Sequence, residues 1–318
     1  MQLFEEDVFL PPKVLRENVL SIAKKQSLLE ERRICELSEM ARFAAEYLSA
    51  LSDGEMPPVD ALSLLSLGEE DALIHEGALS QTVPYLDLHA KSLSSLDKAV
   101  FVSLLSERLV ALGLDLKESD FLPAASAKEI FTYVKNLYAD EAYDVFSQSF
   151  EDPRLFYSES LRDAVAAVED GRAGYCLLPL EEKGGIRLAS VSQMLYRSDL
   201  RIASVTPVYG YGEETGLTYA LISRGFCIPP VEGEDDRYLE LRLPKDTCPL
   251  SELLMAAEIF GARVYRIQTL QLESGAEQKP FYSVVLCSEG RDFVLLLIYL
   301  FTFVKDFAPI GIYSNLEA

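Results

Sequence analysis

The chain has 318 residues, and its 29 basic and 51 acidic side chains give a formal net charge of −22 beside a hydrophobic fraction of 49%. A chain with that apolar fraction buries enough surface to offset its conformational entropy, so disorder of the whole chain is excluded. A strongly acidic surface repels phosphate backbones and anionic lipids, and no run of basic residues is longer than Arg32-Arg33. We therefore expect neither nucleic acid nor a membrane surface as a partner.

The first residues, the cysteines and the histidines bear on compartment and metal chemistry. Residues 1–12 lack the basic start, the long apolar run and the cleavage site of a signal peptide, which predicts a cytoplasmic protein. The five cysteines form no C-x-x-C pair and are expected to be reduced and buried. His75 and His89 lie 14 positions apart and do not share a helical face as a metal pair. We expect no metal and no cofactor.

Helical patterns dominate the N-terminal part of the chain. Residues 13–53 contain neither glycine nor proline, and their apolar side chains recur three or four positions apart, interrupted by Gln26 and Arg33. This pattern predicts one long helix or a kinked pair of helices. Further helical patches lie at 60–67 and 93–112. We predict an all-α domain over residues 1–122.

Strands and helices alternate in the middle of the chain. Residues 123–149 show helical spacing, and the sequence leaves open whether they also hold a short strand. The elements expected after them are strands at 154–158, 174–180, 200–208 and 217–223 and helices at 161–169 and 186–196. This alternation predicts a largely parallel α/β sheet over residues 123–228. The proline-paired, acidic stretch 229–237 predicts a linker.

The C-terminal part has a different order of elements. We expect strands at 238–243, 263–272, 281–287 and 308–314 and helices at 250–260 and 291–304. The order βαββαβ is that of a ferredoxin-like domain, predicted over residues 237–318. Its second helix is apolar all round at 293–304, yet 12 residues rise only about 18 Å, short of the ~30 Å core of a bilayer. Because a sheet covers one face of a helix, the N-terminal domain or a second subunit must cover the other.

The C-terminal part resembles the ACT domain of prephenate dehydratases. The likeness rests on LELRLP at 239–244, RVYRIQTLQL at 263–272 and GIYSN at 311–315. Upstream, SLRDAVAAVEDGRAGYCLLPLE at 160–181, SDLRIASVTPV at 198–208 and LTYALISR at 217–224 resemble successive segments of the dehydratase core. The resemblance implies a periplasmic-binding-protein-like α/β lobe followed by a regulatory, amino-acid-binding domain, in the context of phenylalanine biosynthesis.

The resemblance also suggests catalytic residues. In the family, an L-P-I-E-N-S strand lines the cleft between two lobes, and the threonine of a T-R-F motif assists loss of the hydroxyl of prephenate as carbon dioxide leaves. The matching residues here are Glu181 and Thr218. However, only the eight residues 209–216 stand where the family inserts a second lobe, and eight residues cannot form a lobe with its own core. We therefore expect a reduced, single-lobe core.

Two groups of candidate ligand-binding residues follow. Glu182, Lys183 and Arg187 form a remodelled polar group near the end of a strand, where α/β sheets place ligands, although a solvated loop is the alternative. In the ACT-like domain, the positions that match the effector-binding segments of the family hold Leu250, Gln268 and Thr269. Only Leu250 is the residue that the family has, which favours a ligand other than phenylalanine.

We predict a non-catalytic relative of prephenate dehydratase that binds an amino acid or an aromatic-pathway metabolite in a sensing or regulatory role, as a homodimer through its ACT-like domain. A diverged, active lyase that forms phenylpyruvate is the first alternative, with Thr218 otherwise an ordinary β-branched strand residue. The second alternative is a chorismate-mutase-like enzyme in the N-terminal helices. It rests on LLEERR at 28–33, whose Arg33 could equally lie at a contact between helices.

Overall fold

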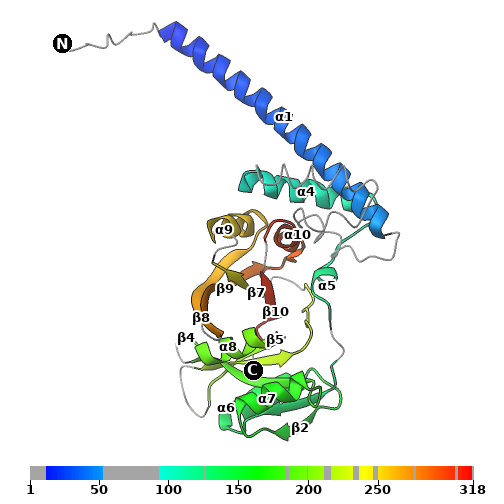
Figure 1. The fold of residues 1–318 in the computed structure, drawn as a ribbon, viewed down its shortest axis with the longest axis vertical. Helices are drawn as coiled ribbons and strands as arrows, with labels where there is room; N and C mark the ends of the chain where they lie inside the picture. The colour runs from blue at the N-terminus through cyan, green and yellow to red at the C-terminus, as the bar shows by residue number, and fades with distance from the viewer. Residues whose placement is uncertain are drawn as a thin grey trace, which may run out of the picture.

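The computed structural model describes residues 12–52, 93–124, 127–182, 186–198, 200–210, 216–231, 236–245, 250–274, 277–304 and 307–316. Within them, one mixed sheet of ten strands has the order β2-β1-β3-β6-β5-β10-β7-β9-β8, with β4 paired to β3 (Figure 1). The strands are β1 Ile130–Tyr133, β2 Arg154–Tyr157, β3 Tyr175–Glu182, β4 Ile186–Arg187, β5 Arg201–Val208, β6 Leu217–Ser223, β7 Asp236–Pro244, β8 Arg263–Ser274, β9 Glu277–Glu289 and β10 Ala308–Ser314. The helices are α1 Pro12–Ser52, α4 Ser95–Ala111, α5 Glu118–Phe121, α6 Leu137–Ser147, α7 Leu161–Glu169, α8 Ala189–Arg197, α9 Leu250–Ile259 and α10 Val294–Phe303.

The predicted class, an N-terminal helical region followed by α/β and ferredoxin-like parts, is confirmed. Helix α7 and strands β6 and β10 begin and end at the predicted residues. The N-terminal helix is one helix of 41 residues rather than a kinked pair. The patch predicted at 60–67, His75, His89 and Cys248 lie outside the described residues.

The sequence left open whether residues 123–149 hold a short strand, and the structure has β1 before α6. Asn136 caps the helix by accepting a hydrogen bond from the Ala139 amide and so separates it from the buried strand. Two other local predictions were wrong. Residues 186–187 form β4 instead of a helical turn. The prediction that every cysteine is buried fails at Cys35, which is exposed on α1.

The first part of the sheet, β1 to β6, is mixed rather than largely parallel. Strand β1 pairs in parallel with β2 and β3, whereas β6 is antiparallel to both β3 and β5. The short connection 209–216 explains this, since strands joined by so few residues pair as antiparallel neighbours. We call these six strands with α6, α7 and α8 the core half.

The second part, β7 to β10 with α9 and α10, is the ferredoxin-like unit. Its strands have the order β10-β7-β9-β8 and are antiparallel throughout, as the βαββαβ order predicts. Residues of β7 alternate between the two faces: Leu239 and Leu241 pack toward α9 and α10, while Tyr238 packs against the core half. Both faces of this part of the sheet are therefore covered.

A close approach between β5 and β10 joins the two halves into one sheet. The strands pair in parallel at Ile202 and Gly311. A Cβ at Gly311 would lie 2.6 Å from the Ile202 carbonyl oxygen, so only glycine permits this approach. The joint sheet curves so that both halves bury side chains around α8.

The apolar helix α10 is covered by helices of its own chain. One side packs on the sheet, and the other meets α4 and α5, with ring-centroid separations of 5.9 Å for Phe101 and Phe303 and 5.4 Å for Phe121 and Phe301. The sequence predicted that either the N-terminal domain or a second subunit covers this face of the helix, and in the structure the N-terminal helices cover it. The helix therefore gives no reason for a second subunit, and dimerisation through the ferredoxin-like unit stays a prediction. None of the described helices combines the length and apolarity needed to cross a membrane.

A buried ion pair fixes α5 to the ferredoxin-like unit. Arg237 Nη2 lies 2.6 Å from Glu118 Oε2, and Glu118 Oε1 accepts hydrogen bonds from Arg237 Nη1 at 3.1 Å and from the Phe293 amide at 2.8 Å. The predicted linker 229–237 thus extended too far: Asp236 and Arg237 belong to β7, and the charge of Arg237 has a buried partner 119 positions away rather than solvent.

We expect Glu118→Gln to lower the free energy of unfolding by about 3–5 kcal/mol, because it leaves the Arg237 guanidinium buried without its counter-charge. Urea unfolding of the full chain measures this loss. Glu107→Gln, at an exposed position on α4, is the matched control and should stay within about 0.5 kcal/mol of the parent. Equal stabilities of the two variants would contradict the role given to this pair.

Candidate functional site

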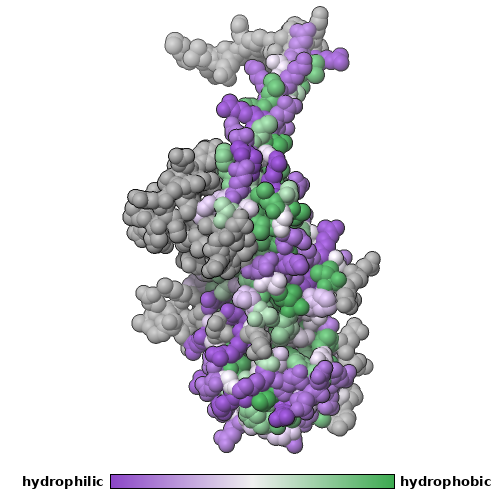
Figure 2. Space-filling view, turned by 90° about the vertical axis from the view of Figure 1, so that its right-hand side faces the viewer, coloured by the Kyte–Doolittle hydropathy of each residue, from purple (hydrophilic) through white to green (hydrophobic). Residues whose placement is uncertain are grey.

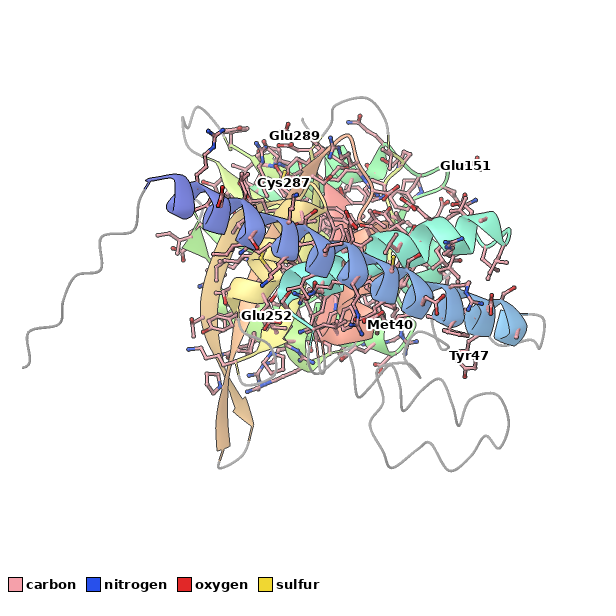
Figure 3. The ribbon with its side chains drawn as sticks, turned by 90° about the horizontal axis from the view of Figure 1, so that it is seen from above. Met40, Tyr47, Glu151, Glu252, Cys287 and Glu289 are labelled. Atoms are coloured by element: carbon pink, nitrogen blue, oxygen red, sulfur yellow. The ribbon has the colours of Figure 1, made fainter. Side chains whose placement is uncertain are left out.

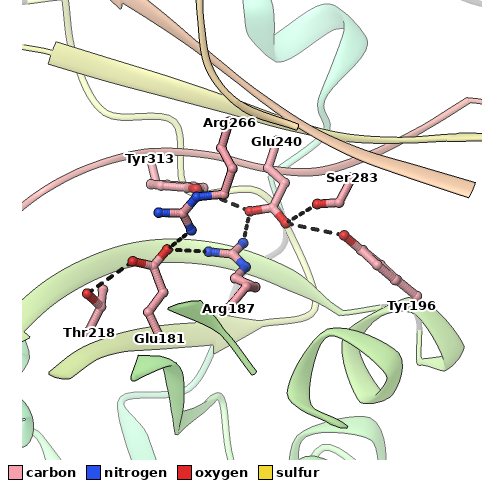
Figure 4. Close-up of polar contacts among 8 residues, drawn as sticks. All are labelled: Glu181, Arg187, Tyr196, Thr218, Glu240, Arg266, Ser283 and Tyr313. Atoms are coloured by element: carbon pink, nitrogen blue, oxygen red, sulfur yellow. Dashed lines mark hydrogen bonds and ion pairs between the residues drawn. The ribbon is translucent and has the colours of Figure 1, made fainter. Parts of the chain in front are cut away.

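Four charged side chains from four strands form a chain of ion pairs where the two halves meet (Figure 4). Arg187 Nη1 donates to Glu181 Oε1 at 3.1 Å, and its Nη2 pairs with Glu240. Arg266 pairs with the same Glu181 oxygen from the other side. The side chains of Arg187 and Glu240 are only 3% and 1% exposed. The order Arg266–Glu181–Arg187–Glu240 alternates in sign and is neutral in total.

Hydroxyl groups complete the shell of Glu240. Its carboxylate accepts hydrogen bonds from Tyr313 at 3.1 Å and from Tyr196 and Ser283 at 3.4 Å each. With the Arg187 guanidinium, these donors surround both oxygens. A buried carboxylate is tolerated only when it is paired in this way, and the bonds to a charged acceptor are stronger than neutral ones.

The buried charges change the proton affinity of their neighbours. Burial raises the pKa of the Tyr313 phenol well above its usual value of 10.0, and the negative charge of Glu240 raises it further. The pKa of Tyr196 is raised by the same two causes. Burial alone would lower the pKa of Arg187, but Glu240 and Glu181 outweigh it, and the net shift is upward. Both phenols therefore stay protonated donors and Arg187 stays a cation.

Strand register brings Glu181 to this place. It is the direct cross-strand neighbour of Thr218 on β6 and of Arg187 on β4. A register shift between Pro179 and Glu181 locally interrupts the regular pairing of β3 with β6. Thr218 Oγ1 donates to Glu181 Oε2 at 3.5 Å. The two residues proposed as catalytic thus lie together, but within a network that already occupies them.

The predicted ligand-binding residues do not form one group. Arg187 is buried in the network, and Glu182 is exposed at the end of β3. Gln268 follows Arg266 by two positions on β8, on the face toward the core half, whereas Thr269 is exposed. Leu250 begins α9 and packs against the core on the other face of the sheet. Lys183 lies outside the described residues.

Sequence reasoning missed Glu240, Arg266 and Tyr313. A signal was present at Glu240, because a carboxylate between Leu239 and Leu241 in a strand buried on both faces needs a buried cation. Its partner Arg187 is 53 positions away, and no local pattern identifies it.

Arg33, the basis of the mutase-like alternative, pairs with Asp97 where α1 meets α4. Asp97 is also the capping-box residue of α4, so the arginine is held by a helix terminus. Among the residues that the structure describes, no cluster of three or more His, Cys, Asp or Glu side chains is arranged to hold a metal ion.

An open cavity of about 880 Å³ lies on the ferredoxin-like unit, between α9 and the adjoining ends of β8 and β9. Two of its lining residues, Cys287 and Glu289, are labelled in Figure 3. The lining residues are Ser251, Leu254, Met255, Glu258, Gly261, Ala262, Arg263, Val264, Cys287, Glu289 and Arg291. The sequence did not single out these residues, because they come from two segments, 251–264 and 287–291, that only the fold brings together.

Only some of the charged side chains that line this cavity form ion pairs with other described residues. Arg263 pairs with Glu289 at 2.6 Å and with Asp236 at 3.3 Å. Glu258 and Arg291, in contrast, form no ion pair within the described part of the chain. Gly261, at φ +78°, lets the Arg291 side chain lie against the backbone, since a Cβ there would come within 2.6 Å of Arg291 Nη1. Burial raises the pKa of the Cys287 thiol to about 11, so the cavity holds a neutral thiol.

A second cavity, of about 700 Å³, lies between α7 and α8 in the core half, and Met194 and Arg162 are among its lining residues.

The raised pKa of Tyr313 predicts that the free energy of unfolding falls with rising pH in the alkaline range. Above pH 10 the unfolded chain loses the phenol proton while the folded chain keeps it, so the unfolded state binds fewer protons and the free energy of unfolding falls as pH rises. In Tyr313→Phe this contribution disappears, and the decline above pH 10 should become shallower by about 1.4 kcal/mol per pH unit. Denaturant unfolding between pH 8 and 11 tests it. Ser283→Ala also removes a hydrogen bond to Glu240 but no titrating group, so it should lower stability and keep the slope of the parent.

No protein-family model and no curated protein matches the chain. Solved structures that align with it include the prephenate dehydratase of Streptococcus mutans, 13% identical with a TM-score of 0.47 over 58% of this chain and 98% of that one. The quorum-quenching acylase GqqA is 18% identical, with a TM-score of 0.45 over 59% and 95% of the two chains. The prephenate dehydratase of Arthrobacter aurescens, in complex with L-Phe, is 12% identical, with a TM-score of 0.45 over 58% and 89%. An assignment of function therefore depends on the geometry of the chain's own residues.

Proposed function

We propose that the protein is a non-catalytic, small-molecule-binding regulator of dehydratase-like architecture, in which an ACT-like unit binds the ligand. The observation that carries the non-catalytic part is the state of Glu181: both its oxygens are engaged, one by Arg187 and Arg266 and the other by Thr218. A cytoplasmic location and a link to aromatic amino-acid metabolism remain predictions from the sequence.

The charge balance argues against turnover of prephenate. A dicarboxylate substrate needs an excess of positive charge aimed at it, and electrostatic stabilisation of this kind is usually the largest catalytic contribution. Here the cations Arg187 and Arg266 are matched by the anions Glu181 and Glu240. A substrate carboxylate would have to displace a buried partner, at a cost of several kcal/mol. Strands β5 and β6 also pair directly, so no second lobe is inserted between them.

The cavity beside α9 supports the ligand-binding part. It offers a guanidinium, Arg291, and a carboxylate, Glu258, that are not paired with each other or with another described residue. Its apolar lining includes Leu254, Met255 and Val264. A cation, an anion and an apolar surface together suit a zwitterion with an apolar side chain, which is the chemistry of an amino acid.

The position of Arg291 supports a regulatory role. Its backbone carbonyl accepts a hydrogen bond from Arg237 Nη1 at 3.3 Å, and Arg237 is the residue that holds α5 through Glu118. A ligand that orders Arg291 therefore acts on the ion pair between the N-terminal helices and the ferredoxin-like unit. The effector thus has a direct route from the cavity to the helices.

We expect purified protein to form no phenylpyruvate from prephenate, since Glu181 and Thr218 are occupied by each other and by two arginines. A coupled absorbance assay with an active dehydratase as positive control measures this. The contact between Thr218 and Glu181 is the one feature that favours the alternative of an active lyase. Turnover that Thr218→Ala abolishes would establish that alternative and reject the proposal.

We expect an apolar amino acid to raise the melting temperature in a thermal-shift screen, because a ligand at 100 times its Kd adds about 2.7 kcal/mol to the free energy of unfolding. Met255→Trp places a bulky ring in the cavity beside α9, obstructs part of it and should weaken the shift. Met194→Trp does the same in the cavity between α7 and α8 and is the matched control, with the shift retained. If no amino acid stabilises the protein, or if only Met194→Trp weakens the shift, the ligand site proposed here is wrong.

A further inference from the structure

One apolar stripe runs along α1, and only its second half is covered. Leu37, Met40, Ala44 and Leu48 are buried against α4. The same stripe continues toward the N-terminus of the helix, where it includes Val19, Ile22 and Leu29, which are 64%, 56% and 66% exposed.

We call residues 16–34 of α1 the arm. Figures 1 and 2 show it projecting from the body as a lone helix with hydrophobic side chains on its surface. Six of its large apolar side chains are more than half exposed: Val19, Leu20, Ile22, Leu28, Leu29 and Ile34. A single helix of this length is marginal in water, and exposed apolar surface of this extent marks an interaction site.

We propose that the arm pairs with the arm of a second copy of this chain in antiparallel orientation. The stripe has the spacing of coiled-coil core positions, Val19, Ile22, Gln26, Leu29 and Arg33, at alternating steps of three and four. Its apolar members are covered when Val19 meets Leu29 of the second copy and Ile22 meets Gln26. This register centres the pair on residue 24 and is the same for both copies, as a two-fold interface requires.

The position of α4 sets the orientation. Arg33 pairs with Asp97 in the first turn of α4, and from there toward the C-terminus of α1 the stripe belongs to α4. A second helix parallel to α1 would run into α4 at Arg33. An antiparallel helix instead begins near Arg33. The arm of the second copy then covers the stripe on the N-terminal side of Arg33, and α4 covers it on the C-terminal side.

Charge agrees with this arrangement in part, because the register sets one pair of opposite charges together but also places Lys25 beside Lys25 of the second copy. In the proposed register Arg16 lies on the same side as Glu30 of the second copy, and this pair occurs twice by symmetry. Arg32 is already paired with Glu36, and Arg33 with Asp97, so these cations do not oppose the pairing. In this register residues 16–32 of the two arms overlap, over roughly 26 Å, and so short a two-helix contact is expected to bury less than the about 800 Å² per partner of a standard interface. The association is therefore expected to depend on protein concentration.

The experiment compares the mass in solution of three full-length proteins by light scattering over a range of concentrations. The parent should reach twice its 35.5 kDa. Ile22→Asp/Leu29→Asp places charges in the stripe and should remain at the mass of one chain. Leu20→Asp/Leu28→Asp changes two residues of similar exposure on the opposite side of the arm and should reach the mass of the parent. A monomeric parent, with another part of the same chain covering the stripe, would overturn the proposal, as would equal behaviour of the two variants.

Orientation is tested with spin labels on Cys35, which is exposed near the end of the arm. With Cys227 and Cys248 replaced by serine, an antiparallel pair centred on residue 24 places the two labels about 33 Å apart along the axis, from 22 residues at ~1.5 Å each. A parallel pair would bring them within about 20 Å, and that distance would reject the antiparallel arrangement. Circular dichroism of each variant checks that loss of pairing is not loss of folding.

Discussion

Arg187 lies between two carboxylates that come from different halves of the chain, and the joint between the halves depends on it. Glu181 is the next-to-last residue of strand β3 of the core half, and Glu240 is in the middle of strand β7 of the ferredoxin-like unit. Each alone would be a costly buried anion. One guanidinium satisfies both, because its planar fork presents two nitrogens in different directions. The same three residues support the proposal of a structural site, because each of them is paired with another protein group.

In a strongly acidic chain, a buried carboxylate is neutralised only if a basic side chain is buried beside it. In the described interior, Arg187 pairs with two glutamates and Arg237 with one. The excess of negative charge is therefore left to the surface. This distribution also disfavours an anionic substrate at the joint, whereas a zwitterion beside Arg291 and Glu258 carries no net charge to be repelled.

Local sequence patterns predict many of the helices and strands of the fold. Helix α7 follows a serine whose side chain accepts from the Asp163 amide and ends before Gly171, so both its boundaries are visible in sequence. The sequence did not locate strand β1, because its four residues are too few to set a period and adjoin a segment of helical spacing. The site was found in part: Glu181, Thr218 and Arg187 are neighbours across adjacent strands, within reach of motif reasoning. Glu240, Arg266 and Tyr313 were missed because they join the site through packing between halves, which no local signal encodes.

The continuous sheet has a consequence for how the proposed ligand would act on the protein. Two domains joined by a flexible linker respond to a ligand by closing around a hinge, but here β5 and β10 are paired across the approach at Gly311, and a rotation between the halves would break that pairing. The conformational change compatible with this pairing is shear, in which α9, α10 and α4 slide by small distances over a sheet that stays fixed. A regulator built in this way would change how its outer helices are presented to a partner, with its strands acting as the frame against which they move.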